Sequence, residues 1–135
     1  MTGAPIGIAL VGAAGRMGRA VTLAARDRED VRVVRAVERA GAPALGRDLG
    51  EVAGVGPIGV PIADDLDAAA AAADVVVELI HPDAARDVIR AAVSAGRPLV
   101  SGTTGLDAAA HAELDAAAAE IGVLHAANLS PGVAV

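Results

Sequence analysis

Residues 11–19 read Val-Gly-Ala-Ala-Gly-Arg-Met-Gly-Arg, and they are the most informative part of the sequence. It follows a short apolar run that is typical of a β-strand, and it opens a segment with helical propensity. Gly12 permits a tight turn, Gly15 lets a phosphate approach the backbone, and Gly18 lets the helix pack closely on the strand. The free amides at a helix N-terminus attract phosphate, so the pattern predicts a dinucleotide-binding loop. The alternative is an ordinary Gly-rich turn between a strand and a helix.

Apolar runs and Ala-rich segments alternate along the rest of the chain. We expect strands at residues 6–11, 31–37, 58–62, 75–77, 99–100 and 123–125, helices at residues 16–28, 64–73, 82–95 and 107–121, and a loop at residues 40–57. This alternation is typical of βαβ units. We therefore expect an α/β, Rossmann-like doubly wound parallel sheet with helices on both faces.

Several polar or flexible residues directly follow the expected strands. They are Gly12, Glu38, His81, Gly102 and Ala126. Ligands bind at the carboxyl ends of the strands in a sheet of this kind, so we expect these five residues to share one edge.

Glu38 and Arg39 end the second expected strand, 20 residues after Gly18. A carboxylate at this place accepts hydrogen bonds from both hydroxyls of an adenosine ribose. A guanidinium beside it pairs with a 2′-phosphate, so the pair suggests that both NADH and NADPH are accepted. Two solvated charges at a strand end are the alternative interpretation.

Composition excludes several classes of function. The chain has 135 residues and a net charge of −6, which argues against nucleic acid or an anionic membrane as a partner. It contains no Cys, no Lys and no aromatic residue, so thiolate metal sites, Schiff bases and Cys nucleophiles are excluded within it. No signal peptide or membrane span is recognisable, and we expect a cytoplasmic protein. No metal site is expected, because no histidines or carboxylates have metal-ligand spacing.

Later motifs point to one family. Residues 12–19, Glu38-Arg39, the Gly-Thr-Thr-Gly sequence at 102–105 and the Ala-Ala-Asn-Leu-Ser sequence at 126–130 together resemble the 4-hydroxy-tetrahydrodipicolinate (dihydrodipicolinate) reductases of lysine and diaminopimelate biosynthesis. Residues 45–51 also resemble that family. The resemblance extends over essentially the whole chain. It departs at Leu79, where a Phe is usual, and at His81, where a basic residue is common.

The resemblance implies roles for individual residues. The diphosphate would be held by Gly12, Ala13, Ala14, Gly15, Arg16 and Met17; the ribose by Glu38 and Arg39; and the nicotinamide side by His81, Gly102, Thr103, Thr104, Ala126, Ala127, Asn128 and Leu129. The cofactors implied are NADH and NADPH, and the reaction is hydride transfer to a cyclic, unsaturated dicarboxylate. No catalytic residue is assigned within this chain. Of the other histidines, His111 is expected on the surface, and His125 is expected as a strand-end residue with its hydrogen bonds satisfied.

Length separates this chain from the family, whose members continue for about another domain. We expect residues 1–127 to form the dinucleotide-binding domain and residues 128–135 to form a hinge into a substrate and catalytic domain absent from this chain. The isolated chain is then expected to bind nucleotide with little or no turnover, and the full-length protein to be a homotetramer. The alternatives are another two-domain oxidoreductase, such as an aspartate or homoserine dehydrogenase, or a non-catalytic nucleotide-sensing module.

Overall fold

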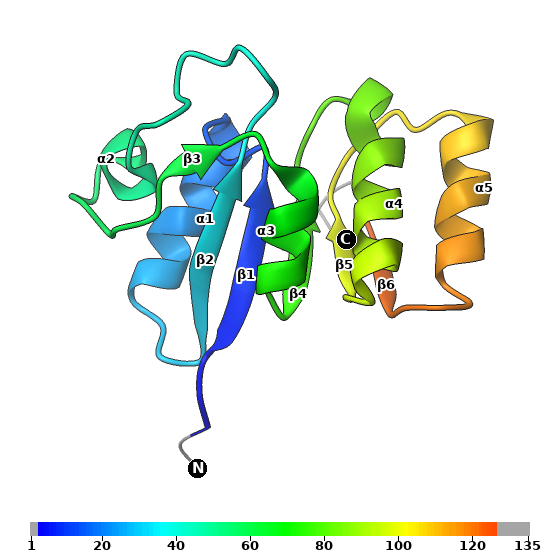
Figure 1. The fold of residues 1–135 in the computed structure, drawn as a ribbon, viewed down its shortest axis with the longest axis horizontal. Helices are drawn as coiled ribbons and strands as arrows, with labels where there is room; N and C mark the ends of the chain where they lie inside the picture. The colour runs from blue at the N-terminus through cyan, green and yellow to red at the C-terminus, as the bar shows by residue number, and fades with distance from the viewer. Residues whose placement is uncertain (1–2, 127–135) are drawn as a thin grey trace, which may run out of the picture.

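A six-stranded sheet in the order β3-β2-β1-β4-β5-β6 forms the centre of the computed structural model, which describes residues 3–126 (Figure 1). All paired strands are parallel. The strands are β1 (Ile6–Val11), β2 (Val31–Val37), β3 (Ile62–Ala63), β4 (Val75–Glu78), β5 (Leu99–Ser101) and β6 (Val123–His125). The α-helices are α1 (Arg16–Arg26), α2 (Leu49–Ala53), α3 (Leu66–Ala72), α4 (Ala85–Ala95) and α5 (Ala108–Ala117), and a short 3₁₀ helix, η1 (Pro82–Ala84), precedes α4. This is the doubly wound Rossmann-like order that the sequence predicts.

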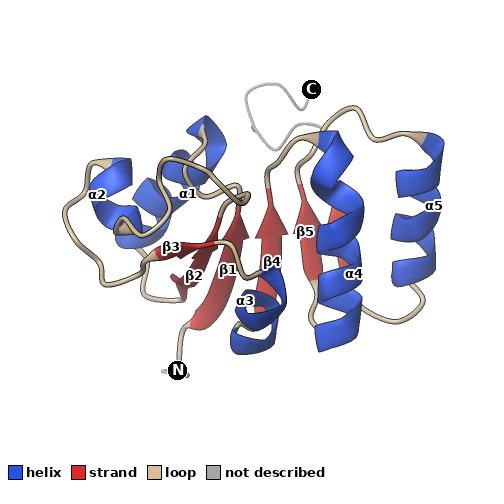
Figure 2. Ribbon diagram, turned by 45° about the horizontal axis from the view of Figure 1, so that its top comes forward, coloured by secondary structure: helices blue, strands red, loops and turns tan. Residues whose placement is uncertain are grey.

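The helices cover both faces of the sheet (Figure 2). Small and branched side chains of α3, α4 and α5 pack on one face, in a cluster that includes Ala70, Ile89 and Leu114 together with Val76 of the central strand β4. Helices α1 and α2 pack on the opposite face against Leu10 and its neighbours. The small alanine side chains let the helix backbones approach the sheet closely. A core without aromatic side chains is therefore still filled.

Capping residues define several helix ends. Asp65 and Asp107 accept hydrogen bonds from the amides three residues ahead, at 3.0 and 2.8 Å, and so cap α3 and α5. Gly96 ends α4 in the left-handed conformation with φ +67°. Pro82 opens a 3₁₀ turn before α4 begins at Ala85, so the predicted single helix over residues 82–95 has two parts.

Two predictions for the middle of the chain are wrong. Residues 40–57 contain the short helix α2 instead of only a loop, and the predicted strand at residues 58–62 is reduced to Ile62–Ala63. Asp48 explains both differences. Its carboxylate accepts from the amide of Glu51 at the start of α2 and from the amides of residues 58–60, at 2.7–3.2 Å. These amides are therefore bonded to a side chain and not to a neighbouring strand.

Asp48 provides a pH-dependent contribution to stability. Hydrogen bonds from the amide of Ile58 and its neighbours lower the pKa of the Asp48 carboxyl below its ordinary value of 3.8. A group whose pKa is lower in the folded chain stabilises the fold above its ordinary pKa and loses that contribution as the pH falls through the folded value. We therefore expect Asp48→Asn to lower Tm at neutral pH, and we expect the difference from wild type to shrink below about pH 4.

Thermal unfolding followed by circular dichroism between pH 3 and pH 7 measures this difference. Asp115→Asn, a change at an exposed carboxylate of α5, is the control and should leave Tm almost unchanged. A Tm difference for Asp48→Asn that stayed constant down to pH 3 would contradict this role of the carboxylate.

Candidate functional site

The last residues of five strands lie side by side across the sheet. Val37 pairs with Val11, Val11 with Glu78, Glu78 with Ser101, and Ser101 with His125. The segments that follow therefore leave the sheet at one edge, visible along the tips of the strand arrows in Figure 2. This confirms the prediction that the residues after the strands share one edge. The order of strands reverses between β1 and β4, which is where open α/β sheets bind ligands.

The glycine loop after β1 is tightly enclosed at two of its three glycines. Gly12 has φ +82°, and a Cβ placed there would collide with the carbonyl oxygen of Leu79. A Cβ on Gly18 would collide with the carbonyl oxygens of Gly12 and Ala13. Gly15 is different, because its Cβ would meet only the Gly12 oxygen, at 3.4 Å. Gly12 and Gly18 are therefore required by packing, whereas a Cβ on Gly15 would make only an ordinary van der Waals contact.

The amides of the loop divide into two groups. Those of Gly12 and Ala13 donate to the Val37 carbonyl, and that of Gly15 donates to the Gly12 carbonyl at 3.2 Å. The first amides of α1, at Arg16 and Met17, have no partner among residues 3–126, as expected for the first turn of a helix. These two amides and the positive end of the helix dipole are thus the groups available to an anion.

Glu38 reaches the same loop from the end of β2. Its carboxylate accepts a hydrogen bond from the Ala14 amide at 2.8 Å, and the side chain is half-buried. Arg39 beside it is exposed. The sequence places Glu38 beside the expected ribose, but its bond to the glycine loop is not visible in the sequence. The carboxylate therefore helps to fix the loop and lies next to the free amides.

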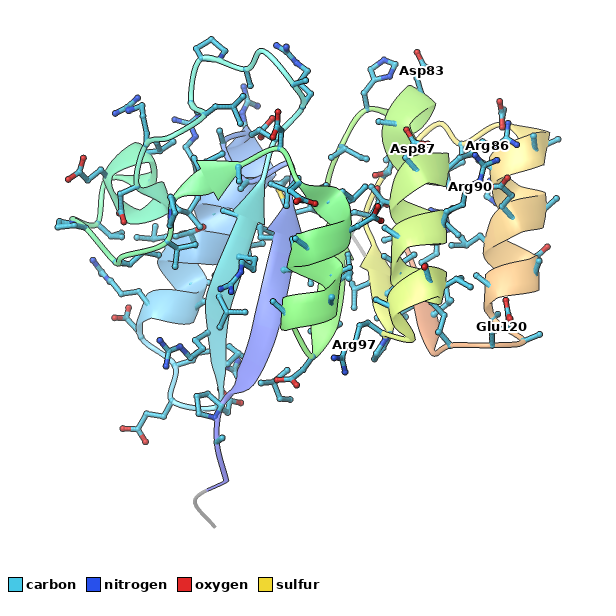
Figure 3. All side chains as sticks on the ribbon, in the orientation of Figure 1. Asp83, Arg86, Asp87, Arg90, Arg97 and Glu120 are labelled. Carbon is cyan, nitrogen blue, oxygen red and sulfur yellow. The ribbon has the colours of Figure 1, made fainter. Side chains whose placement is uncertain are left out.

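A cavity of about 520 Å³ opens along this edge, between the loops after β1, β2 and β4. Its lining includes the glycine loop at Gly12 and Gly15, the charged pair Glu38 and Arg39, and His81. Apolar groups from Leu66, Leu79, Ile80 and Val88 form much of the remaining wall. Asp87 also lines it, and Figure 3 shows Asp83 and Asp87 toward the same end of α4. A cavity of this volume with few polar groups is typical of a small-molecule site.

His81 has a structural task beside this cavity. Its Nδ1 accepts a hydrogen bond from the Asp83 amide at 3.2 Å, so the imidazole caps η1. The side chain is otherwise exposed and also lies 3.4 Å from the Asp83 carboxylate. Both the predicted ligand contact and a role as an exposed loop histidine are compatible with this position.

The segment after β5 is held from three sides. The Thr103 hydroxyl donates to the Glu78 carboxylate at 2.6 Å, and the Ser101 hydroxyl donates to the other oxygen of the same group. His125 Nε2 lies 3.2 Å from the Thr103 carbonyl, and the Ala126 amide donates to the Ser101 carbonyl at 3.0 Å. His125 is therefore hydrogen-bonded at the strand end, as predicted. Glu78 was not among the predicted site residues, because the apolar run before it gives no sign of its partners on β5.

The remaining predicted residues fall into two groups. Met17 and Thr104 are exposed and Gly102 is half-buried, all at the same edge, whereas the Thr103 side chain is only 2% exposed. Ala127, Asn128 and Leu129 lie outside the described residues. His111 is exposed on α5, as predicted, with its ring centroid 5.6 Å from that of His125.

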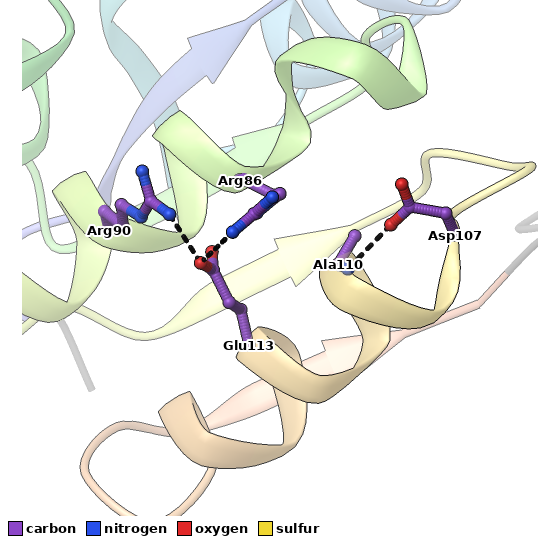
Figure 4. A network of polar contacts seen from close by, with 5 residues as sticks. All are labelled: Arg86, Arg90, Asp107, Ala110 and Glu113. Atoms are coloured by element: carbon purple, nitrogen blue, oxygen red, sulfur yellow. Dashed lines mark hydrogen bonds and ion pairs between the residues drawn. The ribbon is translucent and has the colours of Figure 1, made fainter.

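An ion network joins α4 to α5 (Figure 4). Arg86 and Arg90 both donate to the Glu113 carboxylate, at 2.9 and 2.6 Å. Their guanidinium groups, Arg86 first, lower the pKa of Glu113 below its ordinary value. The network joins the middle of α5 to α4, and the Asp107 cap defines the start of α5 and hence the end of the segment that leaves β5.

Within residues 3–126 no three His, Cys, Asp or Glu side chains come together as a possible metal site. No helix in that range is both long and apolar enough to cross a bilayer.

Comparisons with known proteins agree with this geometry. Residues 6–129 match the family model described as dihydrodipicolinate reductase, N-terminus. The chain is 46% identical over 128 residues to the 4-hydroxy-tetrahydrodipicolinate reductase of Halorhodospira halophila. The aligned region covers 95% of this chain and 48% of that protein. The chain is 48% identical over 126 residues to the reductase of Alkalilimnicola ehrlichii, covering 93% and 47%. The chain thus spans about half the length of the curated relatives it matches.

Solved structures show the same fold at lower identity. A dipicolinate-bound dihydrodipicolinate reductase from Paenisporosarcina sp. TG-14 has a TM-score of 0.69 and 20% identity over 92% of this chain and 48% of that one. GenD2 from gentamicin A biosynthesis, in complex with NAD, has a TM-score of 0.72 and 22% identity over 95% of this chain and 36% of that one. The matched family model and the two reductase sequences together show that this chain belongs to the dihydrodipicolinate reductase family and corresponds to its N-terminal part.

Proposed function

We propose that this chain is the NAD(P)H-binding part of a 4-hydroxy-tetrahydrodipicolinate reductase, an oxidoreductase of lysine and diaminopimelate biosynthesis. The observation that carries the proposal is the meeting of three features at one sheet edge. These are the partnerless amides of Arg16 and Met17, the Glu38 carboxylate on the Ala14 amide, and the adjoining cavity. The relatives that share 46–48% identity with the chain are reductases of this name.

The available groups fit a dinucleotide. The amides of Arg16 and Met17 suit a diphosphate, because they have no partner among the described residues and belong to a helix N-terminus. Glu38 retains one carboxylate oxygen beyond its bond to Ala14 and accepts from ribose hydroxyls, while Arg39 favours a 2′-phosphate. The apolar wall at Leu66 and Val88 suits a purine ring.

The chain's part in the reaction is binding and orientation. A bound reduced nicotinamide supplies the hydride. Residues 102–105 flank the nicotinamide, and the hydrogen bonds of Ser101 and Thr103 keep this segment in place. We propose no proton donor within residues 1–135. The proton and the groups that hold a dicarboxylate substrate would come from the half of the relatives that this chain does not match.

The organisation of the longer protein follows the same proposal. Residues 1–127 form the nucleotide-binding domain, and residues 128–135 lead as a hinge toward the substrate domain. We propose that the full-length protein is a homotetramer that assembles through that second domain. A cytoplasmic location remains a prediction.

Calorimetric titration of the 135-residue chain tests the proposed function, because without aromatic residues the protein gives no intrinsic fluorescence signal. We expect both NADH and NADPH to bind at one site per chain, and we expect adenosine to bind more weakly because it lacks the diphosphate. Heats indistinguishable from dilution for both dinucleotides would contradict the proposal.

A further inference from the structure

A buried carboxylate lies beneath the segment that leaves β5. Glu78, the last residue of β4, has no exposed surface. The hydroxyls of Ser101 and Thr103 donate to its two oxygens. Taking a carboxylate out of water is costly, and an apolar side chain of similar volume would fill the same space without that cost. The hydrogen bonds that Glu78 accepts from Ser101 and Thr103 are therefore the feature that explains why a carboxylate is buried here.

The Thr103 hydroxyl connects two loops through this carboxylate. It donates to Glu78 at 2.6 Å and accepts from the amide of Ile80, at 3.2 Å, in the loop after β4. The amide of Gly102 donates to the main-chain carbonyl of Glu78 at 3.0 Å. The segments that leave β4 and β5 are thus fixed to each other at the wall of the cavity, which Ile80 lines.

Burial alternates along the held segment. Ser101 and Thr103 are each 2% exposed, whereas Gly102 is half-buried and Thr104 is exposed. The two inward hydroxyls therefore determine which backbone groups of residues 102–105 face outward at the sheet edge. Without them, no side chain of this short segment would anchor it to β4.

We propose that Glu78 is a positioning residue for the nicotinamide end of the site, acting through Ser101 and Thr103 on residues 102–105. The inference rests on the proposed function, since it assumes that a dinucleotide occupies the cavity. Glu78 itself touches no ligand. Its effect is to preorganise a loop that would otherwise have to be ordered on binding.

The affinities of two ligands, ADP-ribose and NADH, distinguish an effect of Glu78 on residues 102–105 from an effect on the glycine loop. ADP-ribose contains the diphosphate and both riboses but lacks the nicotinamide, so its affinity reports residues 12–18 and Glu38. The ratio of NADH affinity to ADP-ribose affinity reports residues 102–105. In the wild-type chain we expect NADH to bind more tightly than ADP-ribose in calorimetric titrations.

Thr103→Val removes the hydroxyl and keeps the shape of the side chain. We expect it to weaken NADH binding about tenfold, as for one lost hydrogen bond, and to change ADP-ribose binding less than about twofold. Thr103→Ser, which keeps the hydroxyl, should restore the wild-type ratio to within about threefold. Glu78→Ala should lower the ratio at least as much as Thr103→Val, provided that circular dichroism shows a folded chain.

Thr22→Val is the matched control, because Thr22 is also buried and donates to the Gly18 carbonyl at 2.9 Å, away from β5. It should leave the ratio unchanged. Equal losses of both ligands in Thr103→Val, no loss of either, or failure of serine to restore the ratio would each overturn the inference. So would a wild-type ratio of one, with ADP-ribose binding intact and the proposed glycine-loop site unaffected. Failure of the wild-type chain to bind ADP-ribose would instead refute the proposed function itself.

Discussion

Gly18→Ala is expected to destabilise the chain and to abolish most dinucleotide binding. The new methyl group would collide with the carbonyl oxygens of Gly12 and Ala13, which are backbone atoms that cannot rotate away. Relief requires α1 to move off β1, at a cost of about 1–3 kcal/mol in the free energy of unfolding. The same movement displaces the amides of Arg16 and Met17, and loss of two charge-assisted hydrogen bonds corresponds to about 100-fold weaker NADH binding.

Gly15→Ala provides the comparison within the same loop. Gly15 has φ −72°, and its Cβ would meet only the Gly12 oxygen at 3.4 Å. We expect a loss of stability of at most about 1 kcal/mol, from the poorer helix cap. Binding should still fall, because Gly15 lines the cavity and the methyl group would stand where a ligand approaches. Urea unfolding and calorimetry measure the two effects separately, and equal stability losses for Gly15→Ala and Gly18→Ala would contradict this account of the loop.

Glu38→Ala is expected to weaken NADH binding by about 10- to 100-fold, the effect of losing hydrogen bonds to a charged group. NADPH should lose less, because its 2′-phosphate replaces one ribose hydroxyl and is repelled by the carboxylate in the wild-type chain. Part of the loss arises because the Ala14 amide, which donates to the Glu38 carboxylate at 2.8 Å, loses its acceptor. Glu38→Gln keeps a carbonyl acceptor for that amide and should therefore fall between wild type and Glu38→Ala.

Arg39→Ala is expected to have the opposite cofactor preference from Glu38→Ala. The exposed guanidinium should matter for NADPH and hardly for NADH. Titration of both cofactors into the wild-type chain and the three variants measures the four ratios of NADH affinity to NADPH affinity that are required. Equal losses of NADH and NADPH on Glu38→Ala would refute the assignment of this carboxylate to the ribose.

Sequence patterns identified the parts of the fold that depend on local rules. Apolar runs marked β1, β2 and β6 at their observed bounds, and Ala-rich segments marked α3 and α5 to within a few residues. The order of glycines after β1 predicted the close helix contact at Gly18. Each of these features is determined by residues within about one turn or one strand of each other.

Features that depend on distant partners were not predictable in this way. Helix α2 has only five residues and is held by Asp48, which also binds amides about ten residues further along the chain. Glu78 ends an apolar strand, and only the pairing of β4 with β5 places two hydroxyls on it. The bond between Glu38 and Ala14 likewise joins residues 24 positions apart. Such contacts become visible only when the strand order is known.

A crystal structure of the chain with NADH would show whether the dinucleotide lies where we propose. We expect a diphosphate on the amides of Arg16 and Met17, with the adenosine ribose hydroxyls bonded to Glu38. A dinucleotide bound elsewhere, or a glycine loop that remains empty at saturating NADH, would contradict it.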